Sequence, residues 1–207
     1  MSSVVIVDYG MGNIWSVKSA LDFIGIPSVT SSDPELIIRA SHLILPGVGS
    51  FRKAMKNLTA STIDVAIEHA VNSGSTKILG ICLGMQLLGS QSTEDGMSKG
   101  LGFVPNKVER FDKSANKQEI KIPHVGFNLV QFSKNEGLFS NLPPQSDFYF
   151  VHSYRMLSEN LEGIIGICVY GEKFLAAFQM ENIMGTQFHP EKSQTSGLQI
   201  IKNFVES

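Results

Sequence analysis

The chain has 207 residues, of which 43% are hydrophobic and 17% charged, and its formal net charge is −2 at pH 7. This length and composition suit a globular protein with a substantial core, so we expect one domain over residues 1–207. Lys and Arg are scattered singly and form no basic patch, so we expect neither nucleic acid nor an anionic membrane as partner.

The sequence also lacks the marks of a membrane or secreted protein. No apolar stretch approaches the roughly 18 residues of a membrane span, and the N-terminal residues lack the pattern of a signal peptide. The two cysteines, Cys82 and Cys168, are too few for a disulfide framework. We therefore expect reduced thiols and a soluble, cytoplasmic protein.

The first half of the sequence alternates short apolar runs with helical patterns. Strands are predicted at 4–8, near Val29, at 43–45 and at 78–82, and helices at 14–24 and from 33–34 to about 40, with helical material from about 51 to 72. Strands alternating with helices indicate an α/β fold with a mostly parallel, doubly wound, flavodoxin-like sheet flanked by helices. In such sheets function gathers at the carboxyl ends of the strands.

The second half is richer in β-structure. Strands are predicted at 103–111, 125–132, 147–155, 164–170, 174–180 and 183–189. Polar residues 112–119 predict an exposed hairpin tip. A closing helix is predicted to carry Leu198, Ile201, Phe204 and Val205 on one face.

Cys82 lies between an apolar, strand-like run and a helix-forming run. Gly80 and Gly84 flank it in the pattern Gly-x-Cys-x-Gly, which is the logic of a nucleophile elbow with a thiol as nucleophile. The glycines remove side chains that would collide where a strand turns sharply into a helix. A buried structural cysteine is the alternative for this stretch taken alone, and it is the interpretation we favour for Cys168.

His189, Pro190 and Glu191 form the second signal. In an extended segment residues i and i+2 point to the same side, so the carboxylate of Glu191 can orient the imidazole of His189 as a base for the nucleophile. The other histidines show no clear metal-ligand spacing, and we expect neither a metal nor a cofactor.

The third signal is the loop Pro46-Gly47-Val48-Gly49 at the end of a predicted strand. Glycines there let the backbone approach a ligand. A backbone amide at Val48 or Gly49, together with the amide of Leu83 after the nucleophile, could form an oxyanion hole. A plain turn between strand and helix is the alternative.

Together, the segments 80–86, 46–49 and 187–191 resemble the class I (triad) glutamine amidotransferases, which liberate ammonia from glutamine. Segments 46–51, 123–128, 149–155 and 189–193 resemble more closely the glutaminase subunits of imidazole glycerol phosphate synthase, of histidine biosynthesis. The resemblance runs almost end to end.

This resemblance implies a role for each matching residue. Cys82 would be the nucleophile, His189 the general acid and base, and Glu191 its orienter. Glutamine would be the substrate, bound by the residues Gly47, Gln86, Glu94, Ser153 and Tyr154, with Glu94 opposite the α-ammonium group and Ser153 and Tyr154 receiving the α-carboxylate.

The resemblance also implies a partner, a TIM-barrel cyclase subunit that forms a heterodimer with this chain and consumes the ammonia. Asn13, Phe127, Asn128 and Lys192 match positions on the face that meets it. The family usually has Trp where this chain has Phe127, so the aromatic ring remains but the indole N–H is lost.

Three other functions remain open from the sequence. A paralogous amidotransferase subunit could feed ammonia to a different synthase, for example a sugar-modifying one. A cysteine hydrolase of similar fold and a non-enzymatic binding subunit are the other two, and the combination of Cys82, His189 and Glu191 argues against the last.

Overall fold

A computed structural model describes residues 3–112, 120–158 and 161–207. Its helices are α1 (Ile14–Phe23), α2 (Pro34–Ile38), α3 (Phe51–Ala60), α4 (Ile63–Asn72), α5 (Leu83–Leu88) and α6 (Gln194–Glu206), with 3-10 turns η1 (Gly137–Phe139) and η2 (Pro190–Lys192). Its main strands are β1 (Val4–Val7), β2 (Ser28–Ser31), β3 (His42–Leu45), β4 (Lys77–Ile81), β8 (His124–Phe132), β9 (Gln145–His152), β11 (Ile164–Tyr170), β12 (Glu172–Met180) and β13 (Ile183–Thr186). A smaller set comprises β5 (Gln91–Ser92), β6 (Ser98–Lys99), β7 (Lys107–Arg110) and β10 (Tyr154–Met156).

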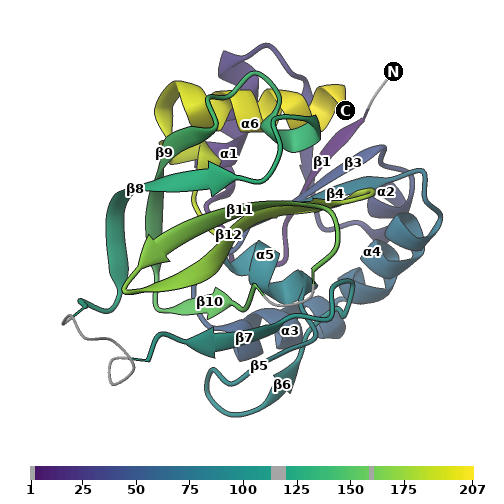
Figure 1. Cartoon of the computed structure of the whole chain (residues 1–207). Helices are drawn as coiled ribbons and strands as arrows, with labels where there is room; N and C mark the ends of the chain where they lie inside the picture. The colour runs from purple at the N-terminus through teal and green to yellow at the C-terminus, as the bar shows by residue number, and fades with distance from the viewer. Residues whose placement is uncertain (1–2, 113–119, 159–160) are drawn as a thin grey trace.

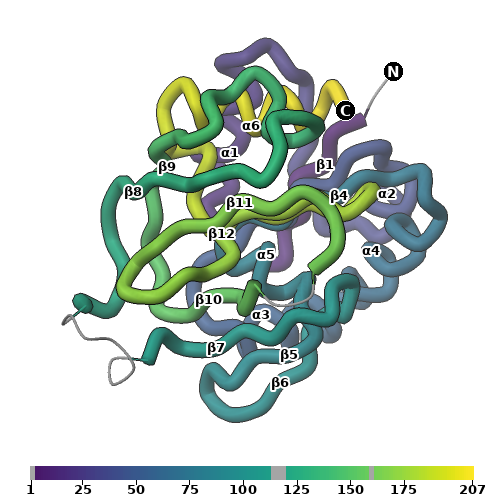
Figure 2. Tube along the Cα trace, in the orientation of Figure 1, coloured from purple at the N-terminus to yellow at the C-terminus, as the bar shows by residue number. Residues whose placement is uncertain are grey.

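The main strands form a nine-stranded sheet in the order β2-β1-β3-β4-β13-β12-β11-β8-β9. The strands from β2 to β13 run parallel, and those from β13 to β9 run antiparallel. The N-terminal strands, purple to blue in Figure 2, meet the C-terminal strands, green to yellow, where β4 pairs with β13. This confirms the predicted α/β fold and its β-rich C-terminal half.

Helices cover both faces of the sheet (Figure 1). α1 and α6 pack on one face, over a core that includes Ile6, Ile44 and Leu79, and α2 to α5 lie on the other, over Val7, Leu45 and Ile78. Alternating residues of one strand therefore enter different cores, as the period of two in a strand requires. Because both faces are covered, the central parallel strands β1, β3 and β4 are mostly apolar, whereas the edge strand β2 has the sequence Ser-Val-Thr-Ser.

The N-terminal elements agree with their sequence patterns. Asp33 caps α2 by accepting a hydrogen bond from the Glu35 amide at 3.0 Å, with Pro34 at the first helical position. The closing helix α6 buries Ile201 and Phe204 as predicted.

Three predicted strands are shorter or differently placed. The 103–111 strand is wrong over its first part, because the Val104 amide bonds the Leu88 carbonyl at the end of α5, and only Lys107–Arg110 form β7. The 147–155 strand breaks at Ser153, because β9 pairs with β8 whereas β10 pairs with β7 in the other sheet. The 183–189 strand ends at Thr186.

The predicted hairpin tip at 112–119 lies, beyond residue 112, outside the described residues. The strands on either side of it, β7 and β8, belong to different sheets and do not pair with each other. The smaller sheet, β10-β7-β5-β6, was not predicted, since β5 and β6 have only two residues each.

Candidate active site

Cys82 lies at the apex of the turn from β4 into α5, as predicted. Its backbone has φ 54° and ψ −108°, a conformation that side-chain-bearing residues rarely adopt. Its amide donates to the Thr186 carbonyl of β13 at 2.7 Å, which ties the apex to the neighbouring strand. Cys82 as a whole is 6% exposed.

The flanking glycines are required by close packing. A Cβ atom on Gly84 would lie 1.7 Å from the Leu45 carbonyl oxygen, and one on Gly80 would lie 2.6 Å from the Met85 amide nitrogen. Any side chain at either position would force β3, β4 and α5 apart. The glycine pattern therefore reports the tight strand-to-helix crossing that creates the elbow.

His189 and Glu191 meet as the sequence predicts, but by a different backbone route. The His189 Nδ1 atom lies 2.8 Å from Glu191 Oε1, and both side chains are almost fully buried. His189 is extended, whereas Pro190 opens the 3-10 turn η2, so the contact does not arise from a continuous strand. Proline is favoured at the first position of a helical turn because its missing N–H would be unpaired there anyway.

The second ring nitrogen of His189, Nε2, is not bonded to Glu191 and is available to a ligand in the adjacent cavity. Within the described residues, His189 Nε2 has no hydrogen-bond partner by distance and angle. Burial lowers the pKa of His189, but interactions with the Cys82 thiol and the Glu191 carboxylate outweigh burial and raise it to about 10. The imidazole is therefore oriented by a carboxylate and lines the same cavity as the thiol.

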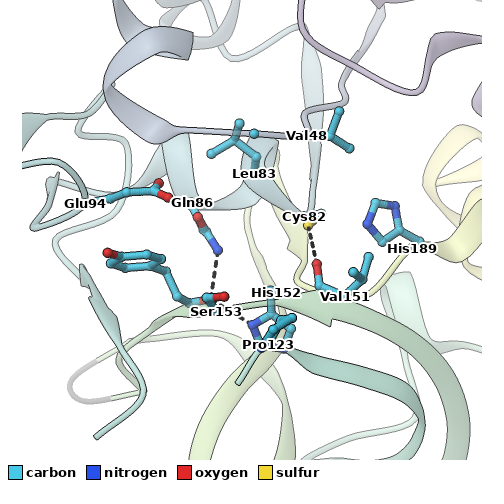
Figure 3. A pocket seen from close by; sticks show the side chains of 12 residues that line it. Val48, Cys82, Leu83, Gln86, Glu94, Pro123, Val151, His152, Ser153 and His189 are labelled. Atoms are coloured by element: carbon cyan, nitrogen blue, oxygen red, sulfur yellow. Dashed lines mark hydrogen bonds between the residues drawn. The ribbon is translucent and has the colours of Figure 1, made fainter. Parts of the chain in front are cut away.

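Cys82 and His189 open into one cavity of about 400 Å³, a size that suits a small-molecule ligand. The cavity is lined by Val48, Gly49, Cys82, Leu83, Gln86, Glu94, Pro123, Val151, His152, Ser153, Tyr154 and His189. Figure 3 shows Cys82 and His189 toward one end and Glu94 toward the other. A thiol, an oriented imidazole and a pocket for a small substrate are the parts needed for acyl transfer through a covalent intermediate.

The predicted substrate residues lie mostly in this cavity. Glu94 lines it and accepts a hydrogen bond from the Phe51 amide, at the N-terminus of α3, at 2.8 Å. Burial raises the pKa of Glu94, while that hydrogen bond opposes the rise. Ser153 and Tyr154 also line the cavity, where the chain passes from β9 to β10.

Gln86 is buried on α5 and bonded within the protein. Its Nε2 atom donates to the Tyr154 carbonyl at 3.0 Å and to Gln187 Oε1 at 2.9 Å. Both amide hydrogens are thereby used, so the side chain joins α5 to the walls of the cavity. Its side chain still contributes to the cavity lining.

The predicted oxyanion residues Val48, Gly49 and Leu83 all line the cavity. Gly49 has φ 106°, which favours glycine, and Val48 is 44% exposed. Gly47 lies behind the cavity wall, where a Cβ atom would come within 2.5 Å of the Tyr9 hydroxyl oxygen. The Tyr9 hydroxyl donates to the Pro46 carbonyl at 2.8 Å and so anchors this loop from behind.

Two of the four residues predicted to face a partner cluster around one ring. Phe127 is 47% exposed and packs edge-on against Tyr149, with ring centroids 5.6 Å apart, and the Lys192 ammonium lies 6.0 Å from the centroid of the same ring. Asn13 occupies the N-cap position of α1 without a side-chain capping hydrogen bond, and α1 packs against η2, the turn that carries Lys192. Asn128 follows Phe127 on β8, and its side chain bonds to His124 at 2.7 Å.

Sequence reasoning assigned no role to Gln187, although it belongs to a quoted motif. Its Nε2 atom donates to Cys82 Sγ at 3.6 Å, and the Cys82 thiol faces the Val151 carbonyl at 4.0 Å. The signal that could have found Gln187 is its place just beyond β13, the parallel neighbour of β4. No pattern in the sequence identifies Tyr9.

Residues 3–112, 120–158 and 161–207 contain neither a membrane-spanning helix nor a cluster of metal-ligating side chains. No helix there is long and apolar enough to cross a membrane. No group of three or more His, Cys, Asp or Glu side chains in the same ranges could hold a metal ion.

Known proteins resemble this chain along its whole length. The glutamine amidotransferase class-I family matches residues 5–207. A relative named "Imidazole glycerol phosphate synthase subunit HisH 1", from Parasynechococcus marenigrum, is 46% identical over 99% of this chain and 98% of its own. The subunit HisH of Moorella thermoacetica is 44% identical over 100% and 95%, respectively.

Solved structures share the fold at low sequence identity. A structure titled as a glutamine amidotransferase has a TM-score of 0.73 and 22% identity, covering 98% of this chain and 97% of its own. PurLQS from Thermotoga maritima has a TM-score of 0.71 and 18% identity, covering 99% and 98%. These two likenesses concern the fold alone.

Proposed function

The chain belongs to the class-I glutamine amidotransferases, and from that premise we propose that it is the glutaminase subunit of an imidazole glycerol phosphate synthase. The observation that carries the proposal is the elbow thiol of Cys82 in one cavity with the buried His189–Glu191 pair. Relatives with the name of that subunit, 40–46% identical over the whole chain, support the choice of reaction.

Cys82 attacks the side-chain carboxamide carbon of glutamine. The carbonyl oxygen gains negative charge in the tetrahedral intermediate, and backbone amides at Val48 or Gly49 and at Leu83 stabilise it. His189 gives its proton to the leaving nitrogen, so ammonia departs and a γ-glutamyl thioester remains on Cys82. Water then attacks the thioester, His189 takes a proton from that water, and glutamate leaves.

The cavity walls hold the ends of the substrate away from the reacting carbon. Glu94 faces the α-ammonium group, which its carboxylate can bind by a charge-assisted hydrogen bond. Ser153 and Tyr154 receive the α-carboxylate. Gln86 fixes the wall by its hydrogen bond to the Tyr154 carbonyl, and Gly47 keeps the loop close enough for its backbone to reach the substrate.

Free ammonia in water is mostly protonated and so is not a nucleophile, which is why an acceptor enzyme must cover the site. The partner is a TIM-barrel cyclase subunit in a cytoplasmic heterodimer, docked on the face that carries Asn13, Phe127, Asn128 and Lys192. The exposed ring of Phe127 beside Tyr149 and the Lys192 ammonium support an amphipathic contact there.

Reconstitution with the candidate cyclase tests this function. Glutaminase activity should be weak for the chain alone and should rise when the cyclase binds its nucleotide substrate. Cys82→Ala should abolish glutamine use while the complex still accepts added ammonia, and Cys168→Ala is the matched control that keeps glutamine use. Glutaminase activity surviving in Cys82→Ala refutes the nucleophile, and equal turnover with and without the nucleotide refutes the coupling.

A further inference from the structure

A buried chain of side-chain hydrogen bonds begins on β8 and ends in the wall of the active-site cavity. Asn128 Nδ2 lies 2.7 Å from His124 Nε2, and His124 Nδ1 lies 2.9 Å from His152 Nε2. His152 Nδ1 then lies 2.8 Å from the Tyr154 carbonyl oxygen. We call these four groups the histidine relay. His124 and His152 are directly opposite each other in the β8–β9 pair.

The chemistry of the end groups fixes the direction of every bond in the relay. A carbonyl oxygen only accepts, so His152 Nδ1 carries a hydrogen and its Nε2 accepts. His124 must therefore donate from Nδ1, and its own Nε2 accepts from the Asn128 amide. Both rings are neutral Nδ1–H tautomers, and all three bonds point from Asn128 toward Tyr154.

Burial and packing hold both rings in this neutral form. His124 is 1% and His152 6% exposed, and His124 stacks on Tyr170 with centroids 4.0 Å apart. Burial lowers the pKa of His124 to about 4 and that of His152 to about 3. The charged or titratable groups that act on His152 are His124, His189 and Arg155, and each lowers its pKa further, while the hydrogen bond to the Tyr154 carbonyl opposes them.

The relay continues to the nucleophile through two glutamines. The Tyr154 carbonyl also accepts from Gln86 Nε2, which donates its other hydrogen to Gln187 Oε1. Gln187 Nε2 in turn donates to Cys82 Sγ at 3.6 Å. Figure 3 shows Gln86, His152 and Cys82 around the same cavity. The side-chain amide of Gln187 therefore places a hydrogen-bond donor against the sulfur of Cys82.

We infer that Asn128, His124 and His152 are positioning residues for the glutaminase reaction. Their one-way relay holds the Tyr154 carbonyl, and this carbonyl orients Gln86 and, through it, the Gln187 donor that faces Cys82. The orientation of the Asn128 amide thus sets the geometry of the glutamine pocket. The link to catalysis rests on the proposed function, and the relay itself rests on the hydrogen bonds.

Asn128→Asp tests the relay because it keeps the shape of the side chain and replaces the Asn128 Nδ2 donor, the first donor of the relay, with an acceptor. His124 must then present Nε2–H to the carboxylate, which reverses the bonds or adds a proton to the pair. Gln131→Glu is the matched control, since it makes the same amide-to-acid change at an exposed position on the same strand.

Two measurements on the full chain separate the relay from the reaction. Ring ¹⁵N NMR of the chain alone should show Nδ1–H tautomers at His124 and His152 in the wild type and in the control, and Nε2–H at His124 in Asn128→Asp. In the complex reconstituted with saturating cyclase, so that weaker docking through Asn128 does not contribute, kcat/KM for glutamine should fall about tenfold, the equivalent of one lost hydrogen bond of about 1.4 kcal/mol. The variant's pH profile should gain an acid limb near neutral pH.

Nε2–H tautomers in the wild type would overturn the relay. An altered tautomer in Asn128→Asp with kcat/KM and pH profile equal to those of Gln131→Glu would overturn its positioning role. If the wild-type complex has no glutaminase activity, the proposed function fails, while the NMR result still decides whether the relay exists.

Discussion

The strained backbone of Cys82 predicts an unusual order of stability between two variants. Cys82→Ala and Cys82→Gly both remove the thiol. Both keep the two backbone hydrogen bonds of residue 82, from its amide to the Thr186 carbonyl and from the Gln86 amide to its carbonyl. They differ in how well they tolerate φ 54° and ψ −108°. A side-chain-bearing residue held there costs about 1–3 kcal/mol, whereas glycine adopts it without strain.

Glycine also makes the unfolded chain more flexible, which costs about 0.4–1 kcal/mol relative to alanine. The difference leaves Cys82→Gly more stable than Cys82→Ala by about 1 kcal/mol, or about 3 °C in Tm for a chain of this size. Urea unfolding of the two variants measures it. Ala60→Gly, at the exposed last residue of α3, is the control and should be less stable than the wild type, by less than the ~1 kcal/mol that glycine costs inside a helix. If Cys82→Gly is the less stable variant, the elbow is not strained.

Three further changes probe the surroundings of the elbow. Tyr9→Phe removes the hydroxyl that donates to the buried Pro46 carbonyl, so urea unfolding should show a free energy of unfolding lower by about 1–3 kcal/mol. The kcat should fall while KM for glutamine stays the same. Unchanged stability would mean that the hydroxyl does not anchor the loop. Glu94→Gln removes the charge proposed to bind the α-ammonium group, so initial rates should show KM raised about tenfold or more at similar kcat, and an unchanged KM would contradict that role. The pKa of His152 is lowered on folding, so the unfolded state binds the extra proton at acid pH. The contribution of His152 to the free energy of unfolding therefore falls as the pH drops below 6.5, by about 2 kcal/mol at pH 5. Unfolding curves of His152→Gln should lack this loss, whereas those of His69→Gln should keep it.

The sequence predicted the elements whose local composition alone determines their structure. Val4–Val7 and residues 43–45 are apolar and flanked by turn residues, so their burial in a parallel sheet follows from composition. Gly84 could be predicted as part of an elbow because the crossing leaves no space for a Cβ atom. The single domain over residues 1–207 stays a prediction.

The sequence did not predict features that depend on pairing between distant segments. The break at Ser153 arises because β9 and β10 join different sheets, and the local pattern of residues 147–155 is strand-like throughout. The Tyr9 hydroxyl reaches the Pro46 carbonyl across 37 positions, and Gln187 reaches Cys82 across 105. No local periodicity encodes such contacts, so they needed the three-dimensional arrangement.

The central claim is that Cys82 attacks glutamine, and the covalent intermediate tests it most directly. The reconstituted complex is mixed with glutamine, quenched in acid within its first turnovers, and its peptides are mapped by mass spectrometry. We expect a γ-glutamyl thioester on Cys82 and none on Cys168, a buried thiol of β11 that serves as an internal control. Turnover of glutamine with no γ-glutamyl group on Cys82, or with the group on Cys168, would contradict the account.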